Sequence, residues 1–176
     1  MAVAVLLTAT GARADDWWKT HMYYDTQNQQ AFNANEFSLD LFGAYQAPER
    51  RFESFPNTSL HHGNWGGGVG GNYFITPQFG LGVDTSFISN TKHFDDHVGG
   101  NLIVRIPIEP IRLAPYIFGG GGRAFNPTWS WYADAGVGLE LRLNPKMGLF
   151  SDARYIWQDN GAGDQAAFRA GIRLVF

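Results

Sequence analysis

The strongest constraint in this sequence is a two-residue alternation, and it is cleanest in residues 168–176. One parity is apolar throughout: Phe168, Ala170, Ile172, Leu174 and Phe176. The other parity carries two arginines, Arg169 and Arg173. Successive side chains of an extended chain point to opposite faces, so this segment predicts a strand with one oily face and one charged face. A strand of a soluble sandwich can alternate too, but an apolar face that ends on an aromatic residue is typical of a transmembrane β-barrel.

The composition agrees with many short strands. Aromatic residues make up 15% of the chain and there are 22 glycines, which favours strands and tight turns over helices. The formal net charge of −3 argues against general nucleic-acid binding, which needs a basic surface. The absence of cysteine excludes a disulfide scaffold and a thiolate metal site. No apolar run reaches the roughly 18 residues of a membrane-spanning helix, whereas alternating strands can cross a membrane without one.

The first 35 residues do not follow the alternation. Residues 1–14 combine a short apolar stretch with the A-x-A pattern Ala12-Arg13-Ala14, which predicts a signal-peptide remnant that lacks its positive start. A short buried helix or strand is the alternative. Residues 15–35 are interpreted as an N-terminal periplasmic or interfacial segment, since Trp18 and Met22 are at helical spacing. An ordered tail packed under the barrel, or a disordered one, stays open.

Residues 36–176 predict an all-β fold, an eight-stranded antiparallel up-and-down transmembrane β-barrel. The strands are expected at residues 37–45, 65–74, 79–87, 97–106, 113–124, 129–143, 147–157 and 168–176. The faces of the fifth strand are not predicted, because Pro115 and the glycines 119–122 blur its alternation. The connections after the odd-numbered strands read as polar loops and those after the even-numbered strands as short turns, which matches extracellular loops and periplasmic turns.

Outward aromatic residues gather at the strand ends, as expected for the two membrane–water interfaces. One end collects Phe37, Tyr73, Phe79 and Phe176, and the other collects Tyr45, Trp65, Phe87, Trp131, Tyr155, Trp157 and Phe168. Inward positions carry five carboxylates and five arginines: Asp40, Asp84, Asp134, Glu140 and Asp152 against Arg105, Arg142, Arg154, Arg169 and Arg173. Confined charges must pair, and eight strands enclose a space that side chains can fill, so a plugged lumen without a wide pore is predicted.

These features resemble the small eight-stranded bacterial outer-membrane barrels of the OmpA/OmpX-like group. The resemblance lies in the alternation, in Phe176, in the turn Asn144–Lys146 before residues 148–155, and in the run 136–142. It implies insertion into the bacterial outer membrane through recognition of the C-terminal strand by the barrel-assembly machinery. It also implies contact with outer-membrane lipid and lipopolysaccharide, and a monomer is expected. It implies no particular activity, because this fold hosts anchors, adhesins, receptors and enzymes.

Three motifs carry weaker signals. Gly66, Gly68 and Gly71 fit G-x-G-x-x-G, but a strand continues after them where a dinucleotide site needs a helix. Histidines and aspartates in the first two outer loops are conceivable divalent-ion ligands, although a solvated polar loop is favoured: His61, His62, His93, Asp95, Asp96 and His97. The loop bases Arg50, Arg51 and Lys92 are conceivable partners for lipopolysaccharide phosphates. No cofactor and no resident metal ion are expected.

The leading hypothesis is a non-enzymatic barrel that anchors surface loops, chiefly residues 46–64, for a structural or surface-binding role. A lipid A-modifying enzyme is the first alternative, because Ser59 and His61 have the two-residue spacing of a known deacylase pattern in reverse order. A lipocalin-like soluble carrier of an apolar ligand is the second alternative. It requires an apolar interior, which the predicted inward charges oppose.

Overall fold

The structure is a computed structural model that describes residues 30–48, 63–89, 94–125, 129–159 and 164–176. Residues 31–176 form one compact unit, whereas the predicted signal-peptide remnant and most of segment 15–35 lie outside the described residues. In the described part of the chain, no helix is long and apolar enough to cross a membrane. Residues 31–35 belong to the same unit as the strands, so that unit begins before the first strand.

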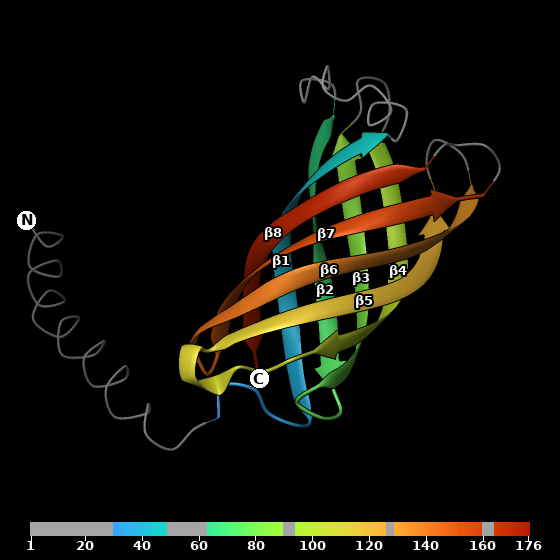
Figure 1. Ribbon diagram of the computed structural model, residues 1–176. Helices are drawn as coiled ribbons and strands as arrows, with labels where there is room; N and C mark the ends of the chain where they lie inside the picture. Colours follow the sequence, from blue (N-terminus) through green and yellow to red (C-terminus); the bar gives the residue numbers. More distant parts are fainter. Residues whose placement is uncertain (1–29, 49–62, 90–93, 126–128, 160–163) are drawn as a thin grey trace, which may run out of the picture. The chain divides into compact units, whose positions relative to one another are not determined.

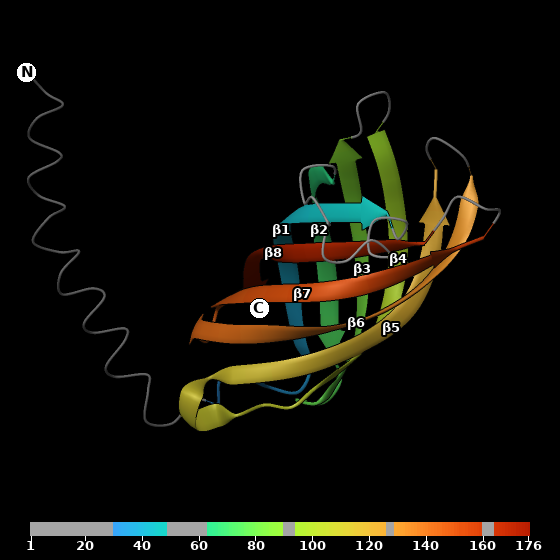
Figure 2. The same ribbon diagram turned by 45° about the horizontal axis from the view of Figure 1, so that its top comes forward.

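Eight antiparallel strands close into a barrel, because β1 pairs with both β2 and β8 (Figures 1 and 2). The strands are β1 (Glu36–Pro48), β2 (Asn64–Phe74), β3 (Phe79–Ser89), β4 (Phe94–Arg105), β5 (Leu113–Ala124), β6 (Ser130–Asn144), β7 (Met147–Gln158) and β8 (Gln165–Val175). Each strand pairs with its neighbours in sequence, which confirms the predicted eight-stranded up-and-down topology. A closed ring leaves no strand edge with unpaired backbone groups, which is the condition for spanning lipid with strands.

The two faces of each strand divide as the alternation predicts. Ile172 and Leu139 are 43% and 51% exposed on the outside, whereas their neighbours Arg173 and Glu140 are 3% and 0% exposed. The structure also resolves the fifth strand, in which Tyr116 and Phe118 are buried and Ile117 is 58% exposed. A one-residue slip of any strand against its neighbours would turn its charged face outward, so the pairing registers fix which side chains face inward.

Two details of the predicted connections are wrong. β4 begins at Phe94 and not at His97, so Asp95 and Asp96 are strand residues and not part of a loop. Residues 106–112 between β4 and β5 form a longer connection than residues 90–93 between β3 and β4, and they include the 3₁₀ helix η3 (Glu109–Ile111). The connection between β3 and β4 is short because these strands keep pairing out to Ser89 and Phe94, beyond the point where their apolar alternation ends.

The other even-numbered connections are tight turns with local side-chain caps. Thr76 Oγ1 accepts hydrogen bonds from the backbone N–H groups of Gln78 and Phe79, at 3.3 and 3.0 Å. Asn144 Oδ1 accepts one from the backbone N–H of Lys146 at 2.9 Å. Both arrangements let a side chain replace the missing ladder partner where the chain reverses.

Large inward aromatic rings lie across glycines of the neighbouring strand. A Cβ added at Gly138 would lie 2.3 Å from Cζ of Tyr116, and one added at Gly122 would lie 2.5 Å from the hydroxyl of Tyr132. The missing side chain is what lets each ring lie flat against the barrel wall. Glycine in β5 and β6 is therefore a packing requirement of the narrow interior.

Candidate functional site in the barrel interior

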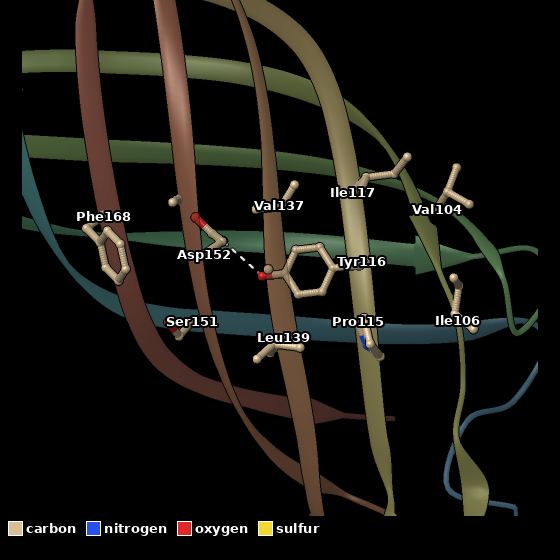
Figure 3. Close-up of a pocket in the computed structure, with 12 residues that line it drawn as sticks. Val104, Ile106, Pro115, Tyr116, Ile117, Val137, Leu139, Ser151, Asp152 and Phe168 are labelled. Carbon is tan, nitrogen blue, oxygen red and sulfur yellow. Dashed lines mark hydrogen bonds between the residues drawn. The ribbon is translucent and has the colours of Figure 1, made fainter. Parts of the chain in front are cut away.

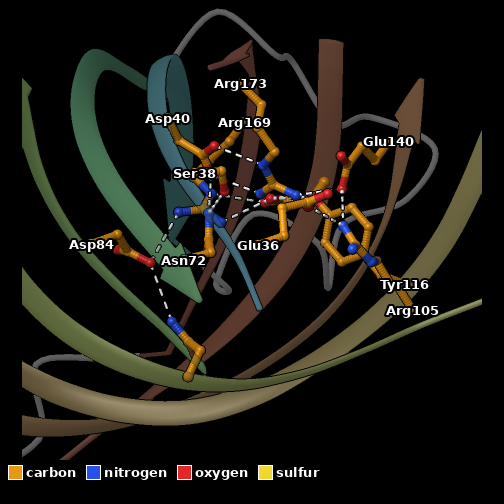
Figure 4. A network of polar contacts seen from close by, with 12 residues as sticks. Glu36, Ser38, Asp40, Asn72, Asp84, Arg105, Tyr116, Glu140, Arg169 and Arg173 are labelled. Atoms are coloured by element: carbon orange, nitrogen blue, oxygen red, sulfur yellow. Dashed lines mark hydrogen bonds and ion pairs between the residues drawn. The ribbon is translucent and has the colours of Figure 1, made fainter. Parts of the chain in front are cut away.

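The interior of the barrel holds two groups of charges. We call the group nearer η3 the lower cluster, and it pairs three carboxylates with three arginines: Glu36, Asp40 and Glu140 with Arg105, Arg142 and Arg173 (Figure 4). Glu140 is its centre, because its carboxylate contacts Arg142 Nε, lies 2.5 Å from Arg173 Nη1 and lies 3.5 Å from Arg105 Nη1. Every member is at most 9% exposed, so the pairing takes place out of bulk water.

Asp40 and Glu36 complete the lower cluster from β1. Arg173 donates to both carboxylate oxygens of Asp40 at 2.7 Å, through Nε and Nη2. Glu36 Oε1 accepts from Arg105 at 3.0 Å and from Arg142 at 2.5 Å. These bidentate and shared contacts use the planar fork of the guanidinium, which lysine does not have.

The upper cluster lies farther from η3 and has one more carboxylate than arginine: Asp84, Asp134 and Asp152 with Arg154 and Arg169. Arg169 donates to both oxygens of Asp152 at 2.8 Å and lies 3.2 Å from Asp84. Arg154 bridges Asp84 and Asp134 at 3.1 and 2.9 Å. Both clusters link strands that are not neighbours in the sheet, so they tie opposite walls of the barrel together.

Phenylalanine rings line the arginine faces. Arg105 lies over the rings of Phe74 and Phe32, with its Cζ 3.5 and 4.9 Å from the ring centroids. Arg169 lies over Phe42 at 4.8 Å, and Arg173 lies over Phe150 at 5.2 Å. A ring face stabilises a desolvated cation and fills the space that the ion pairs leave.

Phe32 closes the η3 end of the interior. It is 1% exposed and contacts the guanidinium groups of Arg105 and Arg142, at 4.9 and 5.1 Å from its ring centroid. The backbone N–H of Ala31 donates to Glu109 Oε2 at 2.8 Å, which fastens the segment to η3. The chain just before β1 therefore enters the mouth of the barrel.

Little empty space is left between these side chains. Two enclosed hollows in the described interior each have a volume of about 20 Å³, lined by upper-cluster residues among others. A volume of that size holds about one water molecule. The buried tyrosine Tyr116 adds to the filling and donates its hydroxyl to Asp152 at 2.9 Å.

The structure places all ten predicted inward charges in this interior. Sequence reasoning missed Glu36 and Phe32. Glu36 has the same parity as Ser38 and Asp40, so the alternation itself carried the signal for it. Phe32 lies outside the alternating region, and no pattern in the sequence marks it.

The structure places the eleven predicted interface aromatics on the outside. Nine are more than 40% exposed: Phe37, Trp65, Tyr73, Phe79, Phe87, Trp131, Trp157, Phe168 and Phe176. Tyr45 and Tyr155 are half-buried, and their rings pack against Trp65 and Trp157 with centroids 5.0 Å apart in both pairs. Their contact with the membrane interface stays a prediction.

Two apolar hollows lie on the outer face, with volumes of about 480 and 1,090 Å³. The smaller one, which we call the outer hollow, is bordered by Ile117, Val137, Leu139 and Phe168 on β5, β6 and β8 (Figure 3). The Tyr116 ring extends behind β6 toward Asp152 on β7 at this point. The outer hollow is therefore a depression on the outer face, lined mainly by apolar residues, with Tyr116 and Asp152 also at its border.

The weaker motifs do not assemble a site in the described residues. Gly66 and Gly68 lie within β2, where an added Cβ would come within 2.2 Å of backbone oxygens of β3. His97 is 5% exposed against the Tyr132 ring, whereas Asp96 has the opposite parity, so the two do not face one ion. No group of three metal-ligating side chains occurs among the described residues.

The remaining loop candidates lie outside the described residues: Arg50, Arg51, Ser59, His61, His62, Lys92 and His93. Asp95 lies in β4. The hydrolase-like pair Ser59 and His61 is therefore untested and stays a hypothesis.

No protein-family model and no curated protein matches the chain. Several solved structures are similar to it, among them three outer-membrane proteins. The N-terminal β-barrel domain of Pseudomonas aeruginosa OprF matches with a TM-score of 0.57 and 17% identity, over 81% of this chain and 98% of that one. Neisserial surface protein A gives 0.58 and 16%, over 80% and 96%. Ail, the attachment invasion locus protein of Yersinia pestis, gives 0.53 and 12%, over 81% and 99%.

The chain has the fold of the small outer-membrane β-barrels. An apolar exterior around an ionic interior is stable in lipid and not in water, so the exterior of this barrel suits a membrane. The same arrangement, apolar outside and ionic inside, rules out the lipocalin-like alternative. An apolar-ligand carrier needs an open apolar interior, and this one is filled by ion pairs.

Proposed function

We propose that this outer-membrane barrel is a non-conducting, non-enzymatic anchor that holds its connecting segments at the cell surface. The filled interior carries the proposal. Two ion-pair clusters and Phe32 occupy the lumen, and the enclosed hollows of about 20 Å³ are too small to form a water-filled path. A transport function would need these buried pairs to separate, which costs several kcal/mol for each charge left alone.

A rigid, closed body is what an anchor requires. The longest connection, residues 49–63, leaves the end of the barrel opposite η3, as do the connections after β3, β5 and β7. We propose that this end faces the outside of the cell and that residues 49–63 carry the surface-binding role. Outer-membrane barrels in general place their longer loops on that side.

Assembly and partners follow from the same proposal. The apolar, aromatic face of β8 is proposed to be recognised by the barrel-assembly machinery, and the outward apolar band to contact outer-membrane lipid and lipopolysaccharide. The closed sheet leaves no edge for strand pairing between copies, which supports a monomer.

Planar-bilayer recordings of the purified, heat-modifiable protein test the closed lumen. No current steps above the lipid background are expected. Reproducible unitary openings would contradict the anchor proposal and favour a pore. For the enzyme alternative, cells that carry His61→Ala are expected to give the same lipid A mass spectrum as cells with the unchanged protein, and a shift in acyl composition would reinstate that alternative.

A further inference from the structure

Two charged side chains point outward among the strand side chains that the structure describes. Arg123 on β5 pairs in register with Val98 and Trp131, which are 49% and 63% exposed on the outer face. Asp96 on β4 pairs with the outward Phe87. Both lie at the end of the barrel opposite η3. A charge on the lipid side is costly unless it meets a polar group, so each needs an explanation.

Arg123 is held by tryptophan rings. Its Cζ lies 4.3 Å from the ring centroid of Trp129 and 5.1 Å from that of Trp131. Its Nε is buried and has no hydrogen-bond partner within the described part of the chain. Among the described residues no ion pair joins Arg123 to Asp96, the nearest outward acid in the register. The Arg123 guanidinium is therefore positioned by aromatic contacts, and its Nε–H can still donate a hydrogen bond to a bound group.

Trp129 and Trp131 indicate the depth in the membrane at which the Arg123 guanidinium lies. Trp129 and Trp131 are 62% and 63% exposed, and amphipathic rings of this kind favour the headgroup level of a membrane. The groups found at that level on the outer leaflet of a bacterial outer membrane include the phosphates of lipid A. Arginine matches phosphate with paired N–H donors.

Below Arg123 the outer face is smooth and leads to the outer hollow. The outward residues of β5 toward η3 are Gly121 and Gly119, and their partners on β6 are Ala133 and Ala135. Ile117, which borders the outer hollow, comes six residues before Arg123 on β5. Six strand residues span about 20 Å, or about 15 Å of depth at a tilt near 40°, which is about half of the hydrocarbon core of about 30 Å.

We propose that Arg123, Trp129 and Trp131 bind a phosphate of lipid A, and that one acyl chain of the same molecule runs over Gly121 and Gly119 into the outer hollow. The inference rests on the proposed orientation, in which the end opposite η3 faces the outer leaflet. Charge complementarity selects an anionic lipid over a neutral one. Asp96 lies beside the site and repels the phosphate, so it limits the affinity.

Native mass spectrometry of the full chain in non-ionic detergent micelles tests the site. The probes are bis-phosphorylated hexa-acyl lipid A, the same lipid without its phosphates, and inorganic phosphate. The unchanged protein is expected to retain one phosphorylated lipid A. Arg123→Gln is expected to weaken retention at least about ten-fold, the effect of losing one charge-assisted contact. Asp96→Asn is expected to strengthen it.

The matched control is Lys146→Gln, which removes a basic charge from the exposed turn at the η3 end and is expected to leave retention unchanged. Equal loss with Lys146→Gln would show general electrostatic attraction and overturn the site. Equal retention of the dephosphorylated lipid would overturn the phosphate contact. Saturable binding of inorganic phosphate at the same affinity would overturn the lipid as the occupant. Heat-modifiable migration of each variant shows that it is folded, and channel recordings test the anchor proposal separately.

Discussion

Glu140 is the residue on which the lower cluster converges. Its side chain is fully buried, and it makes ion pairs with Arg105, Arg142 and Arg173 from three other positions around the lumen. A buried cluster of this kind contributes little beyond an apolar substitute of equal volume, but removing one partner leaves charges without compensation. Replacing a single residue of this cluster is therefore expected to destabilise the barrel strongly.

Glu140→Gln is expected to lower the free energy of unfolding by about 3–5 kcal/mol, because three arginines would then share two carboxylates. Urea unfolding in phospholipid vesicles, followed by tryptophan fluorescence, measures this loss. The matched control is Asp159→Asn, an acid-to-amide change at an exposed position, with an expected effect below about 1 kcal/mol. Equal stability of the two variants would show that the network does not hold the barrel together.

Gly138 is the second residue with a specific structural role. Its backbone lies against the Tyr116 ring, and an added Cβ would stand 2.3 Å from Tyr116 Cζ. Gly138→Ala is expected to destabilise the barrel by about 1–3 kcal/mol through overpacking. Gly71→Ala is the matched control, because its Cβ would meet no atom closer than 3.8 Å. The same unfolding assay compares the pair, and a Gly138→Ala variant as stable as Gly71→Ala would contradict the packing argument.

At the scale of elements, the segment before β1 acts as part of the barrel. Ala31 and Phe32 are 6% and 1% exposed, and Ala114 of β5 packs with them. Asn35 has a φ of 56°, a left-handed conformation that asparagine tolerates, and Tyr73 donates to its side-chain oxygen at 3.1 Å. This bend turns the chain from the mouth of the lumen into β1.

Phe32→Ala is expected to release the segment, because it removes the ring between two guanidinium groups. The expected loss of stability is about 3–5 kcal/mol, typical of a buried phenylalanine. Hydrogen exchange at the Ala31 amide, which donates to Glu109, is expected to become fast while the amides in the centre of β5 stay protected. Ala34→Ser, at an exposed position of the same segment, is the control. Unchanged protection of Ala31 in Phe32→Ala would show that the segment is held by other contacts.

At the scale of the whole molecule, the barrel has apolar side chains on its surface and charged side chains in its interior, so its surface is stable in lipid. The cost of an outward charge should then depend on its depth in the membrane. Val137, in the middle of β6 and 60% exposed, and Leu141, nearer its end and 39% exposed, lie on the same outward face. The two positions share a strand and differ mainly in depth.

Val137→Arg is expected to cost about 2–4 kcal/mol in vesicles, and Leu141→Arg, closer to the membrane surface, about 0–1 kcal/mol. The unfolding free energies of the two variants in one lipid measure the difference. Equal costs at both depths would mean that this face is not in hydrocarbon, and the membrane placement would then be wrong.

The alternation alone determined which face of most strands is charged, because a period of two ties every side chain of a strand to its neighbours. Arg173 and Glu140 were predicted to face inward on that basis, and so was Ile172 to face outward. The same reasoning failed for β5, since the glycines 119–122 carry no side chain that reports a face. It also ended β3 too early, at residue 87, and began β4 too late, at residue 97, because backbone pairing continues where the apolar pattern stops.

Only the tertiary structure decided which charges meet and what closes the lumen. Arg173 reaches Asp40 across the closure of β1 with β8, and it reaches Glu140 on β6 past β7, contacts that depend on register and barrel diameter. The burial of Phe32 also depends on the tertiary structure, because the barrel mouth that it fills forms only when the eight strands have closed into a barrel. Sequence periodicity is a local property of each strand, whereas an interior is shared by strands that are distant along the chain.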